Sequence, residues 1–280
     1  MKISCLPVSI FKDICSDRMD LVDWAGVAKE IGYDGIDISI MFLKNRTPTY
    51  LAKLRQGLAD VGLPVIMMTT YPDFTHPDAI QRERELLYLQ SDVALCSELG
   101  VRYLRILAGQ AHPTVDTGAC VDWVSDAFHA VDAYAKHFDV SLVFENHGKP
   151  GAWDNVDFTY DPQNFLRICD RIRDTNIRIN FDTGNITAHG EDPMEILPKV
   201  LDRVETIHVT DMRHRGSFSP TAIGSGVTPN RAVFQYLKAN GFDGWLCIEE
   251  ASGRGFAGVR DAYEYGKTLE DEGSSQIKRL

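Results

Sequence analysis

Residues 240–249 read NGFDGWLCIE, and this stretch contains a complete transition from the end of a helix to a buried strand. Gly241 suits a helix end, because glycine readily adopts the left-handed conformation of the residue that follows a helix. The Asp-Gly pair that comes next is a turn signal. Residues 245–248 are a continuous apolar run that ends at Glu249, and such runs are typical of parallel strands covered by helices. The stretch predicts a helix-to-strand junction of an α/β fold.

The same order of signals recurs near the start of the chain. Residues 31–37 read IGYDGID, again with a glycine, an Asp-Gly turn and the start of an apolar strand. Apolar strand patterns and amphipathic helix patterns then alternate along the whole chain. We expect strands near 2–8, 35–40, 64–69, 102–107, 140–145, 177–182, 204–209 and 245–249. We expect helices near 19–31, 47–61, 77–99, 117–137, 161–173, 192–202, 229–240 and 256–270.

Eight strand-helix units favour closure into a barrel. In a chain of 280 residues each unit has about 35, enough for a strand, a helix and two loops. We therefore predict an α/β fold, a (β/α)₈ TIM barrel that forms a single domain over residues 1–280, with a frayed tail after about residue 270. The alternative is a doubly wound open sheet. Such a sheet usually has a glycine-rich phosphate turn after its first strand, whereas residues 7–12 read PVSIFK.

Composition narrows the class of protein. A net charge of −11 argues against nucleic acid and against anionic membrane surfaces as partners. No stretch reaches the roughly 18 apolar residues of a membrane helix, and the N-terminus does not resemble a signal peptide. The six cysteines are scattered, with no CxxC pair, and suit reduced core thiols. These features predict a cytoplasmic protein. Oligomeric state is not readable, and a homo-oligomer is compatible with the sequence.

The last four expected strands all end on a side chain that binds metals. Glu145 ends the fifth strand, Asp182 the sixth and Glu249 the eighth, while His208 lies near the end of the seventh. In a parallel barrel these ends meet at one mouth, where active sites lie. Acids beside apolar strands are rarely buried unless they are paired or hold a metal. We predict one divalent ion at these four residues; four unrelated, solvated strand ends are the alternative.

The mixture of oxygen and imidazole ligands indicates which ions to expect. It suits Mn²⁺, which we favour, and also Mg²⁺, Co²⁺ or Zn²⁺.

Five segments carry a resemblance to a known family: FENHG (144–148), FDTGN (181–185), HVTD (208–211), GSG (224–226) and GFDGW (241–245) leading to Glu249. In this combination and order they resemble the xylose-isomerase-like TIM-barrel superfamily of sugar (phosphate) isomerases and epimerases, over nearly the whole chain. The resemblance implies that Glu145, Asp182, His208 and Glu249 bind the metal and that the two glutamates also move protons.

The expected chemistry follows from how weakly acidic a C–H bond beside a carbonyl is. A divalent ion bound to the carbonyl and the neighbouring hydroxyl stabilises an enediolate. Glu145 and Glu249, from different strands, can remove a proton from one face and return one to the other. We thus predict a metal-dependent isomerase or epimerase whose partner is a small polyhydroxy substrate: a sugar, a sugar phosphate or a related ketone.

Five further residues are candidates for substrate binding. His147 shares the side of Glu145 by strand alternation, and a loop histidine with no role is equally compatible. Asn185 stands where related epimerases often carry histidine. Asp211 lies three residues after His208, Arg213 belongs to a small basic loop, and Arg105 either contacts substrate or forms a buried ion pair.

Three other functions compete. The same metal and bases can expel a β-hydroxyl as water, as related inosose and dehydroshikimate dehydratases do. An abasic-site nuclease would need additional histidine ligands, yet residues 67–70 and 107–110 read MMTT and LAGQ. A non-enzymatic binding barrel would leave four convergent ligands unused.

Overall fold

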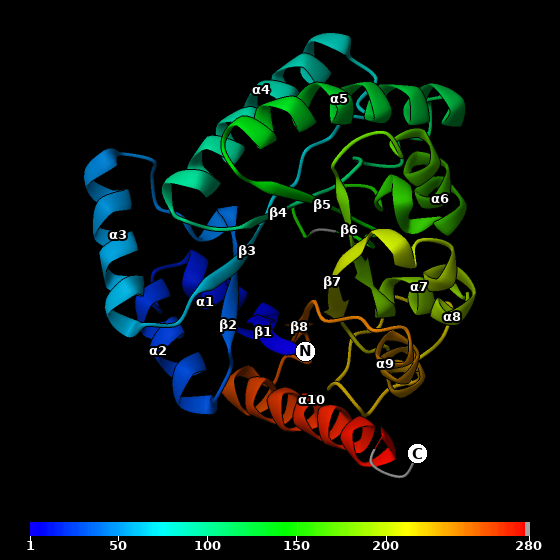
Figure 1. The fold of residues 1–280 in the computed structure, drawn as a ribbon. Coiled ribbons are helices and arrows are strands. Elements are labelled where there is room, and N and C mark those ends of the chain that lie inside the picture. Colours follow the sequence, from blue (N-terminus) through cyan, green and yellow to red (C-terminus); the bar gives the residue numbers. More distant parts are fainter. Residues whose placement is uncertain (150, 278–280) are drawn as a thin grey trace.

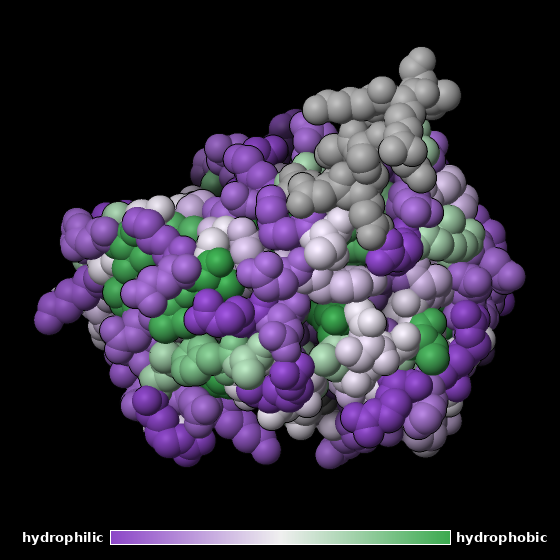
Figure 2. All heavy atoms as spheres, turned by 90° about the horizontal axis from the view of Figure 1, so that it is seen from below, coloured by the Kyte–Doolittle hydropathy of each residue, from purple (hydrophilic) through white to green (hydrophobic). Residues whose placement is uncertain are grey.

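The computed structural model describes the backbone of residues 1–149 and 151–277, and the side chains of these residues up to 269. The tail expected to fray after about residue 270 falls outside the described side chains, so that expectation stays a prediction. Within the described part, no helix is both long enough and apolar enough to span a bilayer. Hydrophilic residues predominate on the face shown in Figure 2, where hydrophobic residues gather only in limited patches.

Eight parallel strands pair in sequence order and close into a barrel when β1 pairs with β8. The predicted closed barrel is therefore confirmed (Figure 1), and the doubly wound open sheet is excluded. The strands are β1 (Lys2–Leu6), β2 (Gly35–Ser39), β3 (Val65–Thr69), β4 (Tyr103–Ile106), β5 (Ser141–Glu145), β6 (Arg178–Asp182), β7 (Val204–Val209) and β8 (Trp245–Glu249).

Helices form a ring outside the barrel, as Figure 1 shows. Most of them begin and end within a few residues of the predicted bounds. The α-helices are α1 (Phe11–Cys15), α2 (Leu21–Ile31), α3 (Pro48–Val61), α4 (Ala79–Glu98), α5 (Thr117–His137), α6 (Pro162–Arg171), α7 (Thr183–His189), α8 (Pro193–Ile196), α9 (Asn230–Ala239) and α10 (Gly255–Ile277). Short 3₁₀ turns are η1 (Val8–Ile10), η2 (Ile40–Phe42), η3 (Phe158–Tyr160), η4 (Leu197–Lys199) and η5 (Leu201–Arg203).

The segment after β6 differs from the prediction of one helix over 192–202. The first helix there, α7, begins directly at Thr183, because the Asp182 carboxylate accepts a hydrogen bond from the Asn185 N–H and caps it. Gly190 ends this helix in the left-handed conformation. Pro198 has no N–H to donate, so the chain continues as α8 and two 3₁₀ turns rather than as one helix.

The two glycines of the internal repeat have the predicted role. Gly32 and Gly241 have φ angles of 114° and 73°. Gly32 directly follows α2, and Gly241 follows shortly after α9; a strand begins soon after each glycine. A side chain at either position would be strained in this conformation. Gly32 and Gly241 therefore occupy equivalent helix-to-strand junctions, the first before β2 and the second before β8.

The barrel interior contains both apolar and polar side chains. A small cluster of buried side chains comprises Ile66, Met67, Tyr103, Val143 and Cys247. Two buried polar pairs are also present: the Thr206 hydroxyl donates to Asn180, and the Ser4 hydroxyl donates to Asp37. Because side chains alternate along a strand, residues two further on also point inward. The fold thus directs the ends of β5 to β8 toward one point at the carboxyl-terminal mouth.

Candidate metal centre

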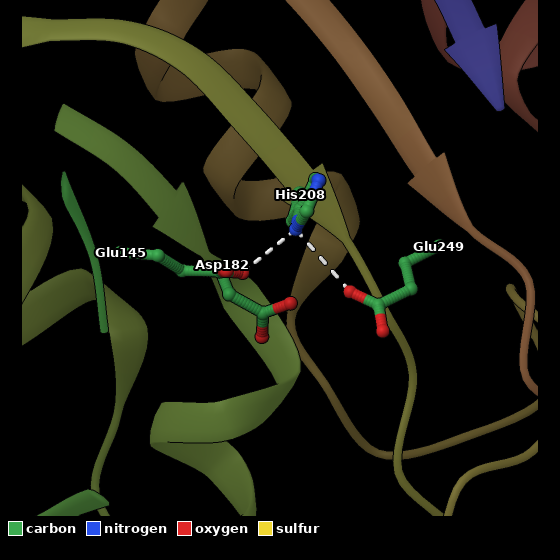
Figure 3. A group of neighbouring side chains, drawn as sticks. All are labelled: Glu145, Asp182, His208 and Glu249. Carbon is green, nitrogen blue, oxygen red and sulfur yellow. Dashed lines mark hydrogen bonds and ion pairs between the residues drawn. The ribbon is translucent and has the colours of Figure 1, made fainter. Parts of the chain in front are cut away.

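The four strand-end residues that the sequence singles out converge on one point. Each of Glu145, Asp182, His208 and Glu249 offers a ligand atom, and these atoms all lie within 4.8 Å of one another. Figure 3 shows their side chains pointing toward a common centre. Glu145, Asp182 and His208 are fully buried, whereas the Glu249 side chain is 20% exposed. Only Glu249 can therefore be reached directly from solvent.

His208 links two of the carboxylates. Its Nδ1 lies 2.7 Å from Glu145 Oε1 and 3.2 Å from Glu249 Oε2, the two contacts dashed in Figure 3. Its other ring nitrogen, Nε2, is buried and has no hydrogen-bond partner. The imidazole therefore presents Nδ1, the atom that would ligate an ion, to the carboxylates.

Arg105 in β4 is the permanent cation of the site. Its Nε lies 3.0 Å from Glu145 Oε2, and its Nη1 donates to the Thr70 carbonyl over 3.0 Å. The guanidinium also lies over the ring of Tyr71, 4.9 Å from the centroid. Of the two roles expected for Arg105, the buried ion pair is present, and its side chain lines the cavity above the centre as well.

Neighbouring strands hold Asp182 in place. The Thr210 hydroxyl donates to both carboxylate oxygens, at 2.9 and 3.2 Å. The Asn146 side chain accepts from the Asp182 N–H and donates to the Asp182 carbonyl, which joins the ends of β5 and β6. Asn146 thus positions the backbone from which Asp182 projects, while Thr210 orients its carboxylate.

The ionisation of Glu145, Asp182 and His208 depends on their charged neighbours. Burial alone would raise the pKa of Glu145, but the charges of His208 and Arg105 lower it to about 2. Burial, together with the charges of Glu145 and Glu249, raises the pKa of Asp182 well above its usual value. Burial would lower the pKa of His208, yet the two glutamates raise it well above 6.5. The negative charge around Asp182 and His208 thus contributes to the raised pKa of each.

The net charge of the centre indicates whether a divalent ion fits there. Three carboxylates face one another, and Arg105 is the one permanently charged cation among the described residues in contact with them. Two negative charges remain when His208 is neutral, and a divalent cation offsets both. Three carboxylates and an imidazole are also ligands that Mn²⁺, Mg²⁺, Co²⁺ and Zn²⁺ accept. The residues present fit such an ion.

His147 lies beside this centre and lines the cavity above it. Its Nδ1 is buried without a hydrogen-bond partner and lies 3.8 Å from Asp157 Oδ2, while burial lowers the pKa of its imidazole to about 4. The Asp157 side chain accepts from Thr159, whose hydroxyl also accepts from the His147 N–H. The ring is therefore neutral near pH 7 and held at the cavity wall.

The other substrate-binding candidates have different surroundings. Asn185 lines the cavity, and its Nδ2 donates to the Asn146 carbonyl over 3.3 Å. Asp211 also lines the cavity, and its carboxylate accepts from the N–H groups of Gly224, Gly226 and Thr228. It therefore fixes a loop at the cavity wall and does not join the four-residue group. Arg213 is exposed and is not among the described residues that line the cavity.

Some functional residues carried no clear signal in the sequence. Asp37 in β2 is fully buried, and burial raises its pKa to about 6. Asp157 caps the 3₁₀ turn η3 and Thr159 lies within it, so strand alternation could not connect them with His147. Gln110 similarly accepts from the N–H groups of Asp154 and Asn155 and ties the loop after β5 to the end of β4.

A cavity of about 760 Å³ opens over the centre at the barrel mouth. Among the four candidate ligands, only Glu249 lines it, and the polar side chains of Arg105, His147 and Asn185 surround the same region. A molecule in the cavity can thus meet Glu249 directly, whereas Glu145 lies beneath, held by Arg105 and His208.

Comparison with known proteins places these features in context. The model of the xylose isomerase-like TIM barrel family matches residues 25–270. An inosose dehydratase of Clostridium botulinum (strain Eklund 17B / Type B) is 26% identical over 249 residues, covering 78% of each chain. An inosose dehydratase of Clostridium tetani (strain Massachusetts / E88) is 24% identical over 207 residues. The alignment with the latter spans 65% of its length, just under two thirds.

Solved structures resemble the fold over almost its full length. A D-tagatose 3-epimerase-like protein has a TM-score of 0.78 at 17% identity, covering 99% of this chain and 100% of that one. The IOLI protein with a bound zinc atom also has a TM-score of 0.78, at 15% identity, and covers 96% of this chain and 98% of that one. At these identities the likeness concerns the fold alone.

Proposed function

Because this chain belongs to the xylose isomerase-like TIM barrel family, we propose that it is a divalent-metal-dependent enzyme acting on a polyhydroxy carbonyl compound. The shared step is removal of a proton from the carbon beside the carbonyl. The observation that carries the proposal is the convergence of three carboxylates and one imidazole within 4.8 Å, at the floor of an open cavity.

Glu145, Asp182, His208 and Glu249 are the residues that would hold the ion. When bound, a divalent ion supplies Lewis-acid stabilisation of the negative charge that develops on substrate oxygen. Arg105 lies against Glu145, and its charge adds to that of His208 in lowering the pKa of that carboxyl. Thr210 and Asn146 fix Asp182, so the ligands are organised before any ion binds.

Glu249 is best placed to take the substrate proton. It lines the cavity, whereas both oxygens of Glu145 already have partners, Oε1 in His208 and Oε2 in Arg105. A proton from the substrate carbon can therefore pass to a Glu249 carboxylate oxygen without displacing an existing contact. His147, neutral at the cavity wall, can hydrogen-bond a substrate oxygen and orient the carbon toward Glu249.

Isomerisation or epimerisation is the first candidate outcome. In an epimerase, one carboxylate removes the proton and another returns one to the opposite face. Glu145 and Glu249 come from strands β5 and β8 and approach the centre from different sides of the barrel. For Glu145 to take part, it has to exchange its contact with His208 for the substrate.

Dehydration is the second candidate, favoured by a separate observation. The sequence relatives reported above are named inosose dehydratases. A dehydratase requires one base and a proton donor for the departing hydroxyl, which agrees with Glu249 being the one candidate metal ligand that lines the cavity. The same Glu249 would remove the proton, and its acid form would return that proton to the hydroxyl that leaves as water.

The two outcomes are separable in D₂O. The substrates to test are ketoses, sugar phosphates and keto-inositols. With one of these classes, we expect the Mn²⁺-loaded protein to incorporate deuterium on the carbon beside the carbonyl. NMR would then show either an epimer or isomer carrying deuterium, or a dehydrated product. Chelated protein should show neither.

Absence of exchange with every substrate class, with each of Mn²⁺, Mg²⁺, Co²⁺ and Zn²⁺, would contradict the proposed step. An equal rate with and without a metal would contradict the role of the ion.

A further inference from the structure

Helix α4 carries the most exposed hydrophobic side chains in the described part of the chain. Leu87, Ile80 and Tyr88 are 63%, 59% and 57% exposed, the three highest fractions among the described large hydrophobic residues. Ile80 lies about two helical turns from the other two, so all three side chains project from one face. In Figure 1, α4 lies on the outside of the helix ring, beside α5. Single exposed hydrophobic residues are ordinary, but a row of three on one face indicates a surface that another molecule covers.

The other face of α4 packs against the core of the protein. Leu89, Val93 and Cys96 are buried there. Because each residue advances about 100° around a helix, these side chains project away from the side that carries Ile80 and Leu87. The exposed row is therefore a second apolar face, which the described residues leave open to solvent.

Two residues of opposite charge, Glu83 and Arg84, stand in the middle of this row. Both are exposed, and neither has an ion-pair partner among the described residues. The charged residues on either side of them, Arg82 and Glu85, have hydrogen-bond partners within the chain. The row thus contains one acid and one base that are free to pair. It carries no net charge in a chain whose net charge is −11, so it does not repel a second copy.

The order of these residues is self-complementary when two copies of α4 run antiparallel. A two-fold axis that passes between residues 83 and 84 sets Glu83 of each copy opposite Arg84 of the other. The same axis sets Ile80 of each copy opposite Leu87 of the other. Every contact across a two-fold axis occurs twice. The helix pair therefore forms two ion pairs flanked by two pairs of aliphatic side chains.

We propose that the protein forms a two-fold symmetric dimer in which α4 packs antiparallel against α4 of a second copy. The aliphatic pairs remove apolar surface from water, and the ion pairs set the register of the two helices. Tyr88 lies opposite Ala79, an exposed residue whose small side chain leaves room for the ring. A contact that uses mainly one helix of each copy is small, so we expect a dissociation constant of roughly 1–100 µM.

Sedimentation velocity of the full chain tests the dimer directly. Over a concentration series that spans the expected dissociation constant, the average mass should rise from that of one chain toward that of two. A wild-type protein that stays monomeric at about 300 µM would overturn the proposal.

A charge placed on the apolar row tests which face forms the dimer. Leu87→Glu introduces a carboxylate at two places in each dimer and should raise the dissociation constant at least about 100-fold. Its circular dichroism spectrum should match the wild type, because Leu87 is mostly exposed. The matched control is Val227→Glu, at a 49% exposed residue after β7, the strand that faces β3 and β4 across the barrel. It should dimerise like the wild type. A dimer that Leu87→Glu leaves intact would overturn the assignment to α4.

A charge exchange tests the antiparallel register. Glu83→Arg and Arg84→Glu each set like charges opposite one another, so each should weaken the dimer about tenfold or more. The double variant exchanges both charges and restores two opposite-charge pairs, so it should dimerise nearly as tightly as the wild type. A double variant that is no tighter than either single variant would overturn the proposed pairing.

The dimer and the proposed function can be tested apart. No residue of α4 is among the described residues that line the cavity or form the four-residue centre. Loss of dimerisation in Leu87→Glu is therefore expected to leave metal-dependent deuterium exchange unchanged, and absence of exchange in the wild type says nothing against the dimer.

Discussion

Replacing Glu249 by glutamine is expected to lower the rate of proton transfer by about 10²–10⁴-fold, the usual cost of losing a general base. Glutamine keeps the shape of the side chain and a carbonyl oxygen that can still accept from His208 Nδ1 or ligate an ion. It loses the basic oxygen that takes the substrate proton. Deuterium exchange beside the substrate carbonyl, measured by NMR at saturating Mn²⁺, gives the rate directly. Glu145→Gln should also lose turnover if both glutamates move protons.

The matched control for this variant is Glu264→Gln, an exposed glutamate on α10 outside the cavity. It should exchange at the wild-type rate. Near wild-type rates in Glu249→Gln and Glu145→Gln would show that these glutamates are only ligands, and the proton would have to leave by another group. If Glu249→Gln no longer bound metal, the missing ion alone would explain a lower rate. The metal content is therefore measured in the same samples.

Adding a divalent ion is expected to stabilise the folded protein substantially, because the unfolded chain lacks the converged ligands. At a free-ion concentration of about 100 times Kd, the free energy of unfolding should increase by roughly 2.7 kcal/mol. For a chain of this size that corresponds to a rise in Tm of roughly 5–10 °C. Differential scanning calorimetry with and without Mn²⁺, after chelation and dialysis, measures the shift.

His208→Ala should remove most of this stabilisation, because it deletes the imidazole that contacts both glutamates. A higher Mn²⁺ concentration should recover part of the shift by mass action. His129→Ala, at a histidine on α5 that bonds to Asp174, is the control and should keep the full shift. An identical Tm shift in wild type and His208→Ala would place the ion elsewhere.

The fold and the four-residue centre could be predicted because the signals that specify them are local. Apolar runs, helix-ending glycines such as Gly32 and Gly241, and the period-two alternation of strands act over a few residues. Once the barrel closes, residues at the ends of neighbouring strands have to meet, so Glu145, Asp182, His208 and Glu249 converge without any information about loops.

The surroundings of the centre could not be predicted because loops determine them. The spacing of Asp211 after His208 made it a candidate for substrate binding, but it could not show that the folded loop offers its carboxylate three backbone N–H groups. The short helix α7 was missed because its cap is Asp182 itself, which strand periodicity assigns only to β6. Phe218 gains its place in the cavity wall from a long connection whose path no local pattern encodes.

The most direct test of the account is a crystal structure of the protein loaded with Mn²⁺, with the ion located by its anomalous scattering. We expect one ion per chain in contact with Glu145, Asp182, His208 and Glu249, at ligand distances of about 2.0–2.2 Å. His208 should bind through Nδ1, the nitrogen that already faces the glutamates. An ion bound elsewhere, or a centre that stays empty at millimolar Mn²⁺ with the four side chains in their present positions, would contradict it.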